Sequence, residues 1–332
     1  MRGLWGGLRS HLIVIGVLIG CAAGTAPAGA QPFPSRPITL VVPFAAGGPT
    51  DTLARILSER IAAELHTTVV VENVAGASGS IAGARVARAT PDGTTITIGH
   101  WGTHVLNGAI FKLPYDVIAD FEPVATIAMG TQLIVGRKSL EASSLKEMIA
   151  WLKANPGKAT AGTAGAGTGA HVAGVFFKAK TGTDFQFVPY RGAGPAMIDL
   201  VAGQIDIMFD QASNSLPQYK NGAIKAFAVT SPTRLASAPD IPTVDEAGLP
   251  GLYISYWHGI WAPKNTPKDI VTRLNAAIAA VLADPSVKQR FGELGQEIPP
   301  PDQQSPAALA AFQKAETEKW WPIVKAADIK PE

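Results

Sequence analysis

Two glycine-rich turns, neither of which contains a lysine, hold the groups of this chain best suited to binding a ligand. The first covers residues 43–51 (PFAAGGPTD) and the second covers residues 162–171 (GTAGAGTGAH). Turns of this kind expose backbone N–H groups at the start of a helix, where hydrogen bonds and the helix dipole together favour an anion. A nucleotide site would normally add a lysine for the phosphates. The two turns therefore favour a carboxylate over a nucleotide as the ligand.

The first turn follows a short apolar run and leads into a predicted helix. Pro49 suits the first position of that helix and Gly48 suits its cap. Gly47 and Gly48 allow the backbone to approach a ligand, and Thr50 and Asp51 offer first-turn amides. The charge of Asp51 would repel an anion, so we expect its side chain to point away or to bind neighbouring amides. An ordinary, well-capped turn between a strand and a helix is the alternative.

The second turn contains Gly165-x-Gly167-x-x-Ala170, which formally matches a dinucleotide-binding fingerprint. Asp184 follows at roughly the distance of a ribose-binding acid. However, residues 158–162 are not an apolar strand, and the turn lies in the middle of the chain rather than in a first βαβ unit. A better account has Thr168 as a helix N-cap with open amides behind it.

Several polar residues stand where predicted strands end. His100 and His104 are four residues apart, but they fall at a strand end with no acidic residue or cysteine between them, so we expect a polar loop at the edge of a cleft rather than a metal site. Arg191 could grip a carboxylate, or could form a surface ion pair with Asp199. Asp210, at the carboxyl end of a strand, could bind a ligand hydroxyl or amine.

Other residues favour structural roles. Asp206 is expected to cap the same strand, and Trp320 and Trp321 are expected to anchor the last helix in the core. One of Trp257 and Trp261 is expected to line the cleft. The sequence contains no G-x-S-x-G or H-E-x-x-H motif and no cysteine nucleophile in the mature chain, so it predicts neither an enzyme nor a bound metal or cofactor.

The first thirty residues indicate an exported protein. A basic start, an apolar run from residue 12 to residue 19 and Ala28-Gly29-Ala30 are typical of a cleaved signal peptide. Residues 18–21 (LIGC) also fit a lipobox, so a lipid anchor on Cys21, the only cysteine of the 332 residues, is the alternative. Removal of residues 1–30 leaves 26 basic and 26 acidic residues. This neutral body argues against nucleic acid and against electrostatic attraction to a membrane.

The order of the predicted elements is that of an α/β protein. Short apolar runs alternate with helical periods from Ile38 onward, and about 300 mature residues are enough for two domains. The last helices have no strands of their own to cover, so they should pack on the first lobe. We therefore expect the chain to cross between lobes twice, with residues 31–133 and 256–332 in lobe 1 and residues 134–255 in lobe 2.

The sequence resembles the Bug-type solute receptors of tripartite tricarboxylate transporters over nearly the whole mature chain. The matching motifs, in order, are residues 35–44 (SRPITLVVPF), 47–51 (GGPTD), 71–73 (VEN), 87–89 (ARA), 91–93 (PDG), 113–116 (LPYD), 189–192 (PYRG), 208–210 (MFD), 228–231 (AVTS) and 242–248 (PTVDEAG). The resemblance implies a two-lobe Venus-flytrap fold of the periplasmic binding proteins. It also implies that backbone amides of one turn per lobe hold the ligand carboxylate.

The resemblance, together with the turn chemistry, predicts the ligand contacts. These are Phe44, Ala45, Ala46, Gly47, Gly48, Thr50, Asp51, Thr103, His104, Ala166, Gly167, Thr168, His171, Arg191 and Asp210. The chain departs from the family at Ala46, where proline is common. It departs again at residues 165–171 (GAGTGAH against the usual GNGTSHH) and at Gln211, where many members have asparagine. The changes in the second turn remove polar groups, and the departures together imply room for a bulkier or less polar ligand.

The function implied is that of an exported, monomeric solute-binding protein. It would capture a small organic carboxylate between its lobes and deliver it to the membrane subunits of a tripartite tricarboxylate transporter. A receptor that presents the ligand to a membrane kinase would share the fold and the site. An exported hydrolase is a third alternative, for which the sequence offers no activated nucleophile.

Overall fold

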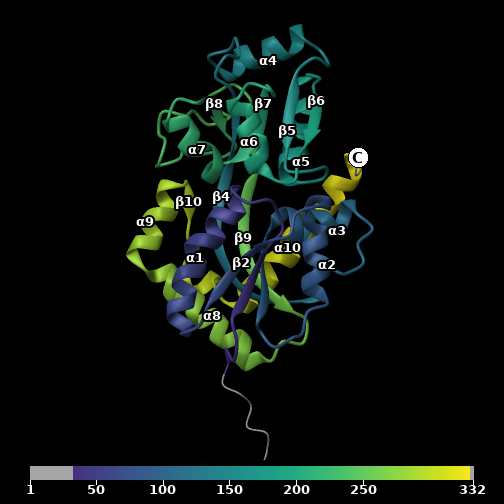
Figure 1. Ribbon diagram of the computed structural model, residues 1–332. Coiled ribbons are helices and arrows are strands. Elements are labelled where there is room, and N and C mark those ends of the chain that lie inside the picture. Colours follow the sequence, from purple (N-terminus) through teal and green to yellow (C-terminus); the bar gives the residue numbers. More distant parts are fainter. Residues whose placement is uncertain (1–32, 330–332) are drawn as a thin grey trace, which may run out of the picture. The chain divides into compact units, whose positions relative to one another are not determined.

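A computed structural model describes residues 33–329, so the predicted signal peptide and Cys21 lie outside the described residues. Strands and helices alternate along most of this part of the chain (Figure 1). The strands are β1 (Ile38–Val42), β2 (Val69–Asn73), β3 (Thr95–His100), β4 (Phe121–Arg137), β5 (Thr160–Thr163), β6 (Gln186–Pro189), β7 (Ile207–Gln211), β8 (Ile224–Val229), β9 (Ser255–Pro263) and β10 (Gln296–Glu297).

The α-helices are α1 (Pro49–Leu65), α2 (Ser80–Ala87), α3 (Asn107–Ile110), α4 (Leu145–Ala154), α5 (Gly169–Thr181), α6 (Ala193–Val201), α7 (Ala212–Lys220), α8 (Lys268–Ala283), α9 (Pro285–Glu293) and α10 (Pro306–Ala326). Three shorter turns of helix are η1 (Ala77–Gly79), the π-helix η2 (Gly102–Leu106) and η3 (Pro301–Gln303). Within residues 33–329 no single helix has both the length and the apolar composition to cross a membrane. Helices α8 and α9 have this length and composition only when they are taken together, and the chain bends by 72° between the two.

The strands pair in the order β2-β1-β3-β9-β4-β7-β5-β6, with β8 and β10 also paired to β4. Strand β1 is parallel to β2 and β3 at one end, and β5 is parallel to β6 and β7 at the other. The long strands β4 and β9 join these two parallel groups, because β4 is antiparallel to β9 and to β7. The predicted two-lobe α/β fold is confirmed, with one lobe built on β1–β3 and the other on β5–β8 (Figure 1).

The apolar sequence of β1 explains why helices cover both faces of the first lobe. Ile38, Leu40, Val41 and Val42 are completely buried, as expected for a parallel strand with helices on both sides. Helix α1 buries a stripe at 3–4 residue spacing that includes Leu53, Leu57 and Ile61. Helices α8 and α10 pack on β4, and α8 also packs on α1. The last helices therefore return to the first lobe.

Two sequence-based expectations near the predicted cleft are wrong. Residues after His100 were expected to form a polar loop, but Gly102–Leu106 is a buried π-helix that continues into α3. The prediction that Trp257 or Trp261 lines the cleft is wrong, because both side chains are fully buried and the indole N–H of Trp261 donates to Gln313 at 3.1 Å.

Candidate ligand-binding site

The first turn ends in the helix start that the sequence predicts. Gly47 has a φ of 83°, Gly48 is the extended N-cap residue and Pro49 is the first residue of α1. The amide of Thr52 makes the first bond of the helical ladder, to the carbonyl of Gly48 at 3.0 Å. The amides of Thr50 and Asp51 precede that bond, so the helix itself supplies no acceptor for them.

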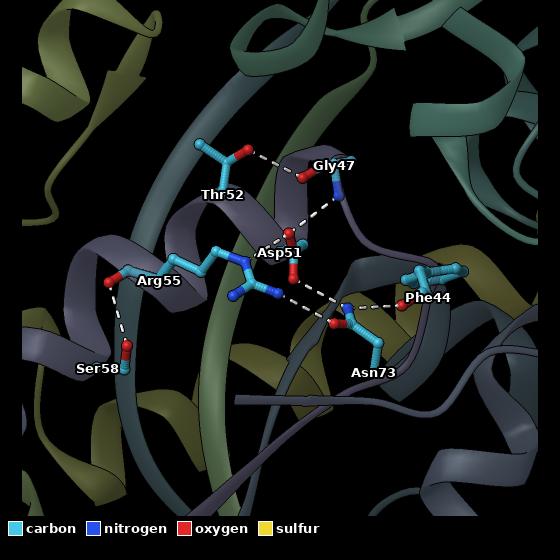
Figure 2. Close-up of polar contacts among 8 residues, drawn as sticks. Phe44, Gly47, Asp51, Thr52, Arg55, Ser58 and Asn73 are labelled. Carbon is cyan, nitrogen blue, oxygen red and sulfur yellow. Dashed lines mark hydrogen bonds and ion pairs between the residues drawn. The ribbon is translucent and has the colours of Figure 1, made fainter. Parts of the chain in front are cut away.

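The Asp51 carboxylate holds this turn together from the protein side (Figure 2). Its Oδ2 accepts from the Gly47 amide and from Nε of Arg55, both at 2.9 Å. Its Oδ1 accepts from Nδ2 of Asn73 at 2.9 Å, and the same amide group donates to the Phe44 carbonyl at 3.0 Å. The expectation that Asp51 binds a neighbouring amide is confirmed.

Burial opposes ionisation of Asp51, but the hydrogen bonds from Arg55, Gly47 and Asn73 outweigh it and lower the pKa of this carboxyl. Asp51 is therefore a fixed anion whose oxygens are already engaged. Through these bonds it fixes the turn that presents the amides of Thr50 and Asp51.

The second turn follows β5, a strand whose composition is not apolar but which is largely buried. Gly165 and Gly167 have φ angles of 122° and 73°, in the region that favours glycine. The amide of Gly167 donates to Nδ1 of His171 at 2.9 Å. Thr168 is the N-cap residue of α5, as predicted, but its hydroxyl donates to the Gly165 carbonyl at 2.7 Å instead of capping a helix amide.

Two hydrogen bonds to backbone carbonyls join the lobes directly. The amide of Ala45 donates to the carbonyl of Arg191 at 3.0 Å, and the hydroxyl of Ser78 donates to the carbonyl of Ala166 at 2.5 Å. Ser78 has a φ of 53°, a conformation that costs energy for a residue other than glycine and is typical of functional contacts. The sequence analysis did not identify Ser78 as a site residue.

A third glycine turn, at the start of α6, also packs against the first turn. An added β-carbon at Gly194 would lie 2.8 Å from the carbonyl carbon of Gly47 and 2.9 Å from the amide nitrogen of Gly48. Gly194 is therefore required for this close approach. The motif at residues 189–192 could have indicated this turn, since glycine after a strand often marks a close backbone contact.

Two cavities adjoin these contacts and share Phe44 and Ala164. The smaller, of about 20 Å³, is lined by Phe44, residues 48–51, His100, Ala164, Ala193, Gln211 and Tyr256. The larger, of about 350 Å³, is lined by Phe44, residues 76–79, Phe111, residues 164–166 and residues 189–191. The structure thus brings Phe44, Gly48, Thr50 and Asp51 of the first turn to the same region as Ala166 and Arg191.

His100, which the expected contacts omit, lines the smaller cavity. Its ring stacks on Phe44 with centroids 5.1 Å apart, and its Nδ1 accepts from the Gly102 amide at 2.9 Å. Burial lowers the pKa of His100 to about 3, so the ring is neutral. Nearby, Nε2 of His258 lies 3.2 Å from the Thr50 hydroxyl. The position of His100 at the end of β3 was the available signal, because parallel strands present ligand groups at their carboxyl ends.

The structure places several other expected contacts behind the cavities. His104 stacks on Trp261 at a centroid distance of 3.7 Å, and the Thr103 hydroxyl lies 3.0 Å from Nδ1 of His104. His171 packs edge-on against Phe187. Neither His104, Thr103 nor His171 lines either cavity.

The acidic residues of β7 have different surroundings. Asp210 is buried and accepts from Nδ2 of Asn214 at 2.8 Å and from the hydroxyl of Ser215 at 2.6 Å. Asp206 does cap a backbone amide, but that of Thr160 at the start of β5, which Oδ2 accepts at 2.8 Å. Its Oδ1 pairs with Nε of Arg137 at 2.8 Å, so the residue also ties β4 to β5.

The alternative pairing of Arg191 with Asp199 is also not what the structure contains. Asp199 accepts from the hydroxyl of Tyr190 at 2.6 Å instead. Asp51 is the only charged residue lining the smaller cavity, and its oxygens are engaged. An anion bound there would be held by neutral hydrogen-bond donors.

Comparison with known proteins places this fold and site in a family. The model of the tripartite tricarboxylate transporter family receptor matches residues 53–329. A protein of Agrobacterium vitis from the ttuE-ttuC' intergenic region is 41% identical over 89% of this chain and 85% of its own length.

Solved structures agree with this assignment. The periplasmic binding protein BugD has a TM-score of 0.86 with 39% identity, over 90% of this chain and all of its own. MatC of Rhodopseudomonas palustris with bound malate has a TM-score of 0.85 with 38% identity, over 88% of this chain and all of its own. The R. palustris protein Rpa4515 with adipate has a TM-score of 0.85 with 35% identity, over 90% of this chain and all of its own. The chain therefore belongs to the tripartite tricarboxylate transporter receptor family and is a Bug-type solute-binding protein.

Proposed function

We propose that this protein captures a small organic carboxylate between its lobes and delivers it to the membrane subunits of a tripartite tricarboxylate transporter. The proposal rests on the backbone amides of Thr50 and Asp51, which precede the first hydrogen bond of helix α1 and line a buried cavity. The donors that this cavity offers to an anion are all neutral. The start of a 17-residue helix adds a favourable dipole at the same point. Malate and adipate in two related structures support a carboxylate ligand.

The proposed mechanism of capture is closure of one lobe on the other around the ligand. The first turn would supply its amides from the lobe of β1–β3, and the second turn would supply those at the start of α5. Each helix start contributes about 0.3–2 kcal/mol toward an anion. Because an open lobe offers one helix start and a closed pair offers two, the ligand would favour the closed state.

We propose that the lobes divide near residues 133 and 256, as the sequence suggests. The pairing of β4 supports this division, since its residues up to Thr131 pair with β9 and those from Gln132 onward pair with β7. We further propose export to the periplasm through residues 1–30 and a monomeric state. The mass of the mature N-terminus distinguishes cleavage after Ala30 from a lipid anchor on Cys21.

A thermal-shift screen with mono-, di- and tricarboxylates, aromatic acids included, tests carboxylate capture. A ligand at 100 times its Kd stabilises the folded protein by about 2.7 kcal/mol, which is readily measured. Gly48→Val and Gly167→Val should then weaken binding of the best acid at least ~10-fold, because a β-carbon at Gly48 meets the Gly194 amide at 3.3 Å and Gly167 has a positive φ.

Gly292→Val, on α9 with no atom within 4 Å of an added β-carbon, is the matched control. Unchanged calorimetric affinity in both turn variants would contradict the two-turn site. Turnover of a bound acid would favour an enzyme instead.

A further inference from the structure

Gln211 presents an unused acceptor in the smaller cavity. It is the last residue of β7, its side chain lines the cavity, and only 6% of the residue is exposed. Its Oε1 is buried and has no hydrogen-bond partner among the described residues. A buried acceptor without a donor lowers stability, and such atoms in native proteins usually serve a ligand or water.

Two residues that line the same cavity as Gln211 carry hydrogen-bond donors. The Tyr256 hydroxyl is one donor, and it lies 3.5 Å from each ring nitrogen of His100, the other residue. Since Nδ1 of His100 accepts from the Gly102 amide, the neutral ring carries its proton on Nε2. The wall therefore holds a proton on His100, a hydroxyl on Tyr256 and a free acceptor on Gln211.

We infer that Gln211 is a specificity-determining residue that accepts a hydrogen bond from a hydroxyl group of the ligand, while the amides of Thr50 and Asp51 bind its carboxylate. The cavity of about 20 Å³ has room for about one water molecule, so the lobes must part for the acid to enter. The ligand class is then the hydroxycarboxylic acids. This inference rests on the proposed carboxylate capture and names the ligand class of that same site.

A hydroxyl fits this acceptor better than an ammonium group does. A buried ammonium needs a carboxylate partner, because an unpaired charge in a low-dielectric site is costly. Both oxygens of Asp51 accept from Gly47, Arg55 and Asn73, and Oδ2 of Asp210 accepts from two side chains of α7. A neutral amide oxygen suffices for a hydroxyl and does not compensate a full positive charge.

Calorimetry with matched acids tests the inference on the exported protein. The pairs are malate and succinate, lactate and propionate, and mandelate and phenylacetate, with aspartate as the amino counterpart of malate. In at least one pair the hydroxy acid should bind at least ~10-fold more tightly than its deoxy partner, because the deoxy acid leaves the Gln211 oxygen unpaired.

Gln211→Leu, which keeps the size of the side chain and removes the acceptor, should bring that ratio close to one while the deoxy acid still binds. Gln132→Leu is the matched control, because Gln132 faces Gln211 in the β4–β7 ladder and is also buried but does not line the cavity. It should leave the ratio unchanged. Thermal unfolding shows whether each variant is folded.

Equal affinities within every pair, an unchanged ratio in Gln211→Leu, or tighter binding of aspartate than of malate would each overturn the hydroxyl assignment. Binding of the deoxy acids would still support carboxylate capture in these cases. Failure of every carboxylate to bind overturns both the assignment and the proposed function. The two failures are therefore distinguishable.

Discussion

The amide of Ala45 donates to the carbonyl of Arg191 at 3.0 Å, and this bond joins the first turn of one lobe to the turn before α6 of the other. No side chain takes part in it. Gly192 and Gly194, on the α6 side, let the two backbones come this close, since a β-carbon at either would lie 3.2 Å or less from a backbone atom of the first turn. Contact between the lobes here depends on the absence of side chains.

Gly194→Ala tests that dependence. The added methyl group would lie 2.8 Å from the Gly47 carbonyl carbon, so the two turns must separate for it to fit. Overpacking of this size costs about 1–3 kcal/mol. Because this cost destabilises the closed state, it should weaken binding of the best acid roughly 5- to 150-fold. Calorimetry measures the affinity. Gly292→Ala is the control, and equal affinity in Gly194→Ala and the wild type would show that closure does not need this contact.

Asp51→Asn tests whether the carboxylate holds the first turn. The amide group keeps the shape but replaces one acceptor oxygen with a donor, which faces the Gly47 amide, Arg55 or Asn73. Loss of one such buried bond costs about 1–3 kcal/mol of unfolding free energy.

Urea denaturation measures the change, and binding of the best acid should weaken as well because the amides of α1 lose their fixed position. Glu59→Gln, at an exposed position of the same helix, is the control and should change stability by less than about 0.5 kcal/mol. A variant of Asp51 as stable as this control would rule out the structural role.

Local sequence was sufficient to predict the parts of the site that lie within one turn. Gly48 and Pro49 start α1, Thr168 starts α5, and Asp51 binds a neighbouring amide, since each depends on residues within four positions. The return of the last helices to the first lobe also followed, because α8 to α10 lacked long strands of their own to cover.

The walls of the smaller cavity could not be predicted in this way. His100, Gln211 and Tyr256 come from β3, β7 and β9, which meet only through sheet pairing far apart in the chain. His100 and His104 were both expected at the edge of the cleft because they lie near a strand end, and only His104 was among the expected ligand contacts. The π-helix at Gly102–Leu106 turns it toward Trp261 instead, and no spacing rule distinguishes its direction from that of His100.

Buried histidines predict a loss of stability in acid. Burial lowers the pKa of His104 to about 3, and repulsion from His100 acts in the same direction once that ring is also protonated. The unfolded histidine has a pKa near 6.5. The unfolded state therefore binds a proton first, so this stability is fully present above about pH 6.5 and is lost as the pH falls toward 3, by up to about 1.4 kcal/mol per pH unit.

His104→Phe, which preserves stacking on Trp261, should reduce the slope of unfolding free energy between pH 6.5 and 4.5 by about 1 kcal/mol per unit. Urea denaturation at several pH values measures it. His66→Asn is the control, because His66 is exposed with a φ of 50° that asparagine tolerates. A slope in His104→Phe equal to that of the control would show that His104 does not resist protonation.

Asp210 predicts the opposite pH dependence. Burial raises the pKa of this carboxyl to about 6, although bonds from Ser215 and Asn214 act in the other direction. The native state then keeps a proton that the unfolded chain has already lost, so stability from this group declines as the pH rises from about 4 to about 6. Asp210→Asn keeps an acceptor for both neighbours and removes the titration. Its free energy of unfolding should match that of the wild type near pH 4 and exceed it by on the order of 1–3 kcal/mol at pH 8.

Denaturant unfolding at the two pH values measures this difference, with Asp302→Asn, at an exposed position, as the control. A constant difference between Asp210→Asn and the wild type at the two pH values would mean that Asp210 is ionised throughout this range, and that the neighbouring hydrogen bonds outweigh its burial.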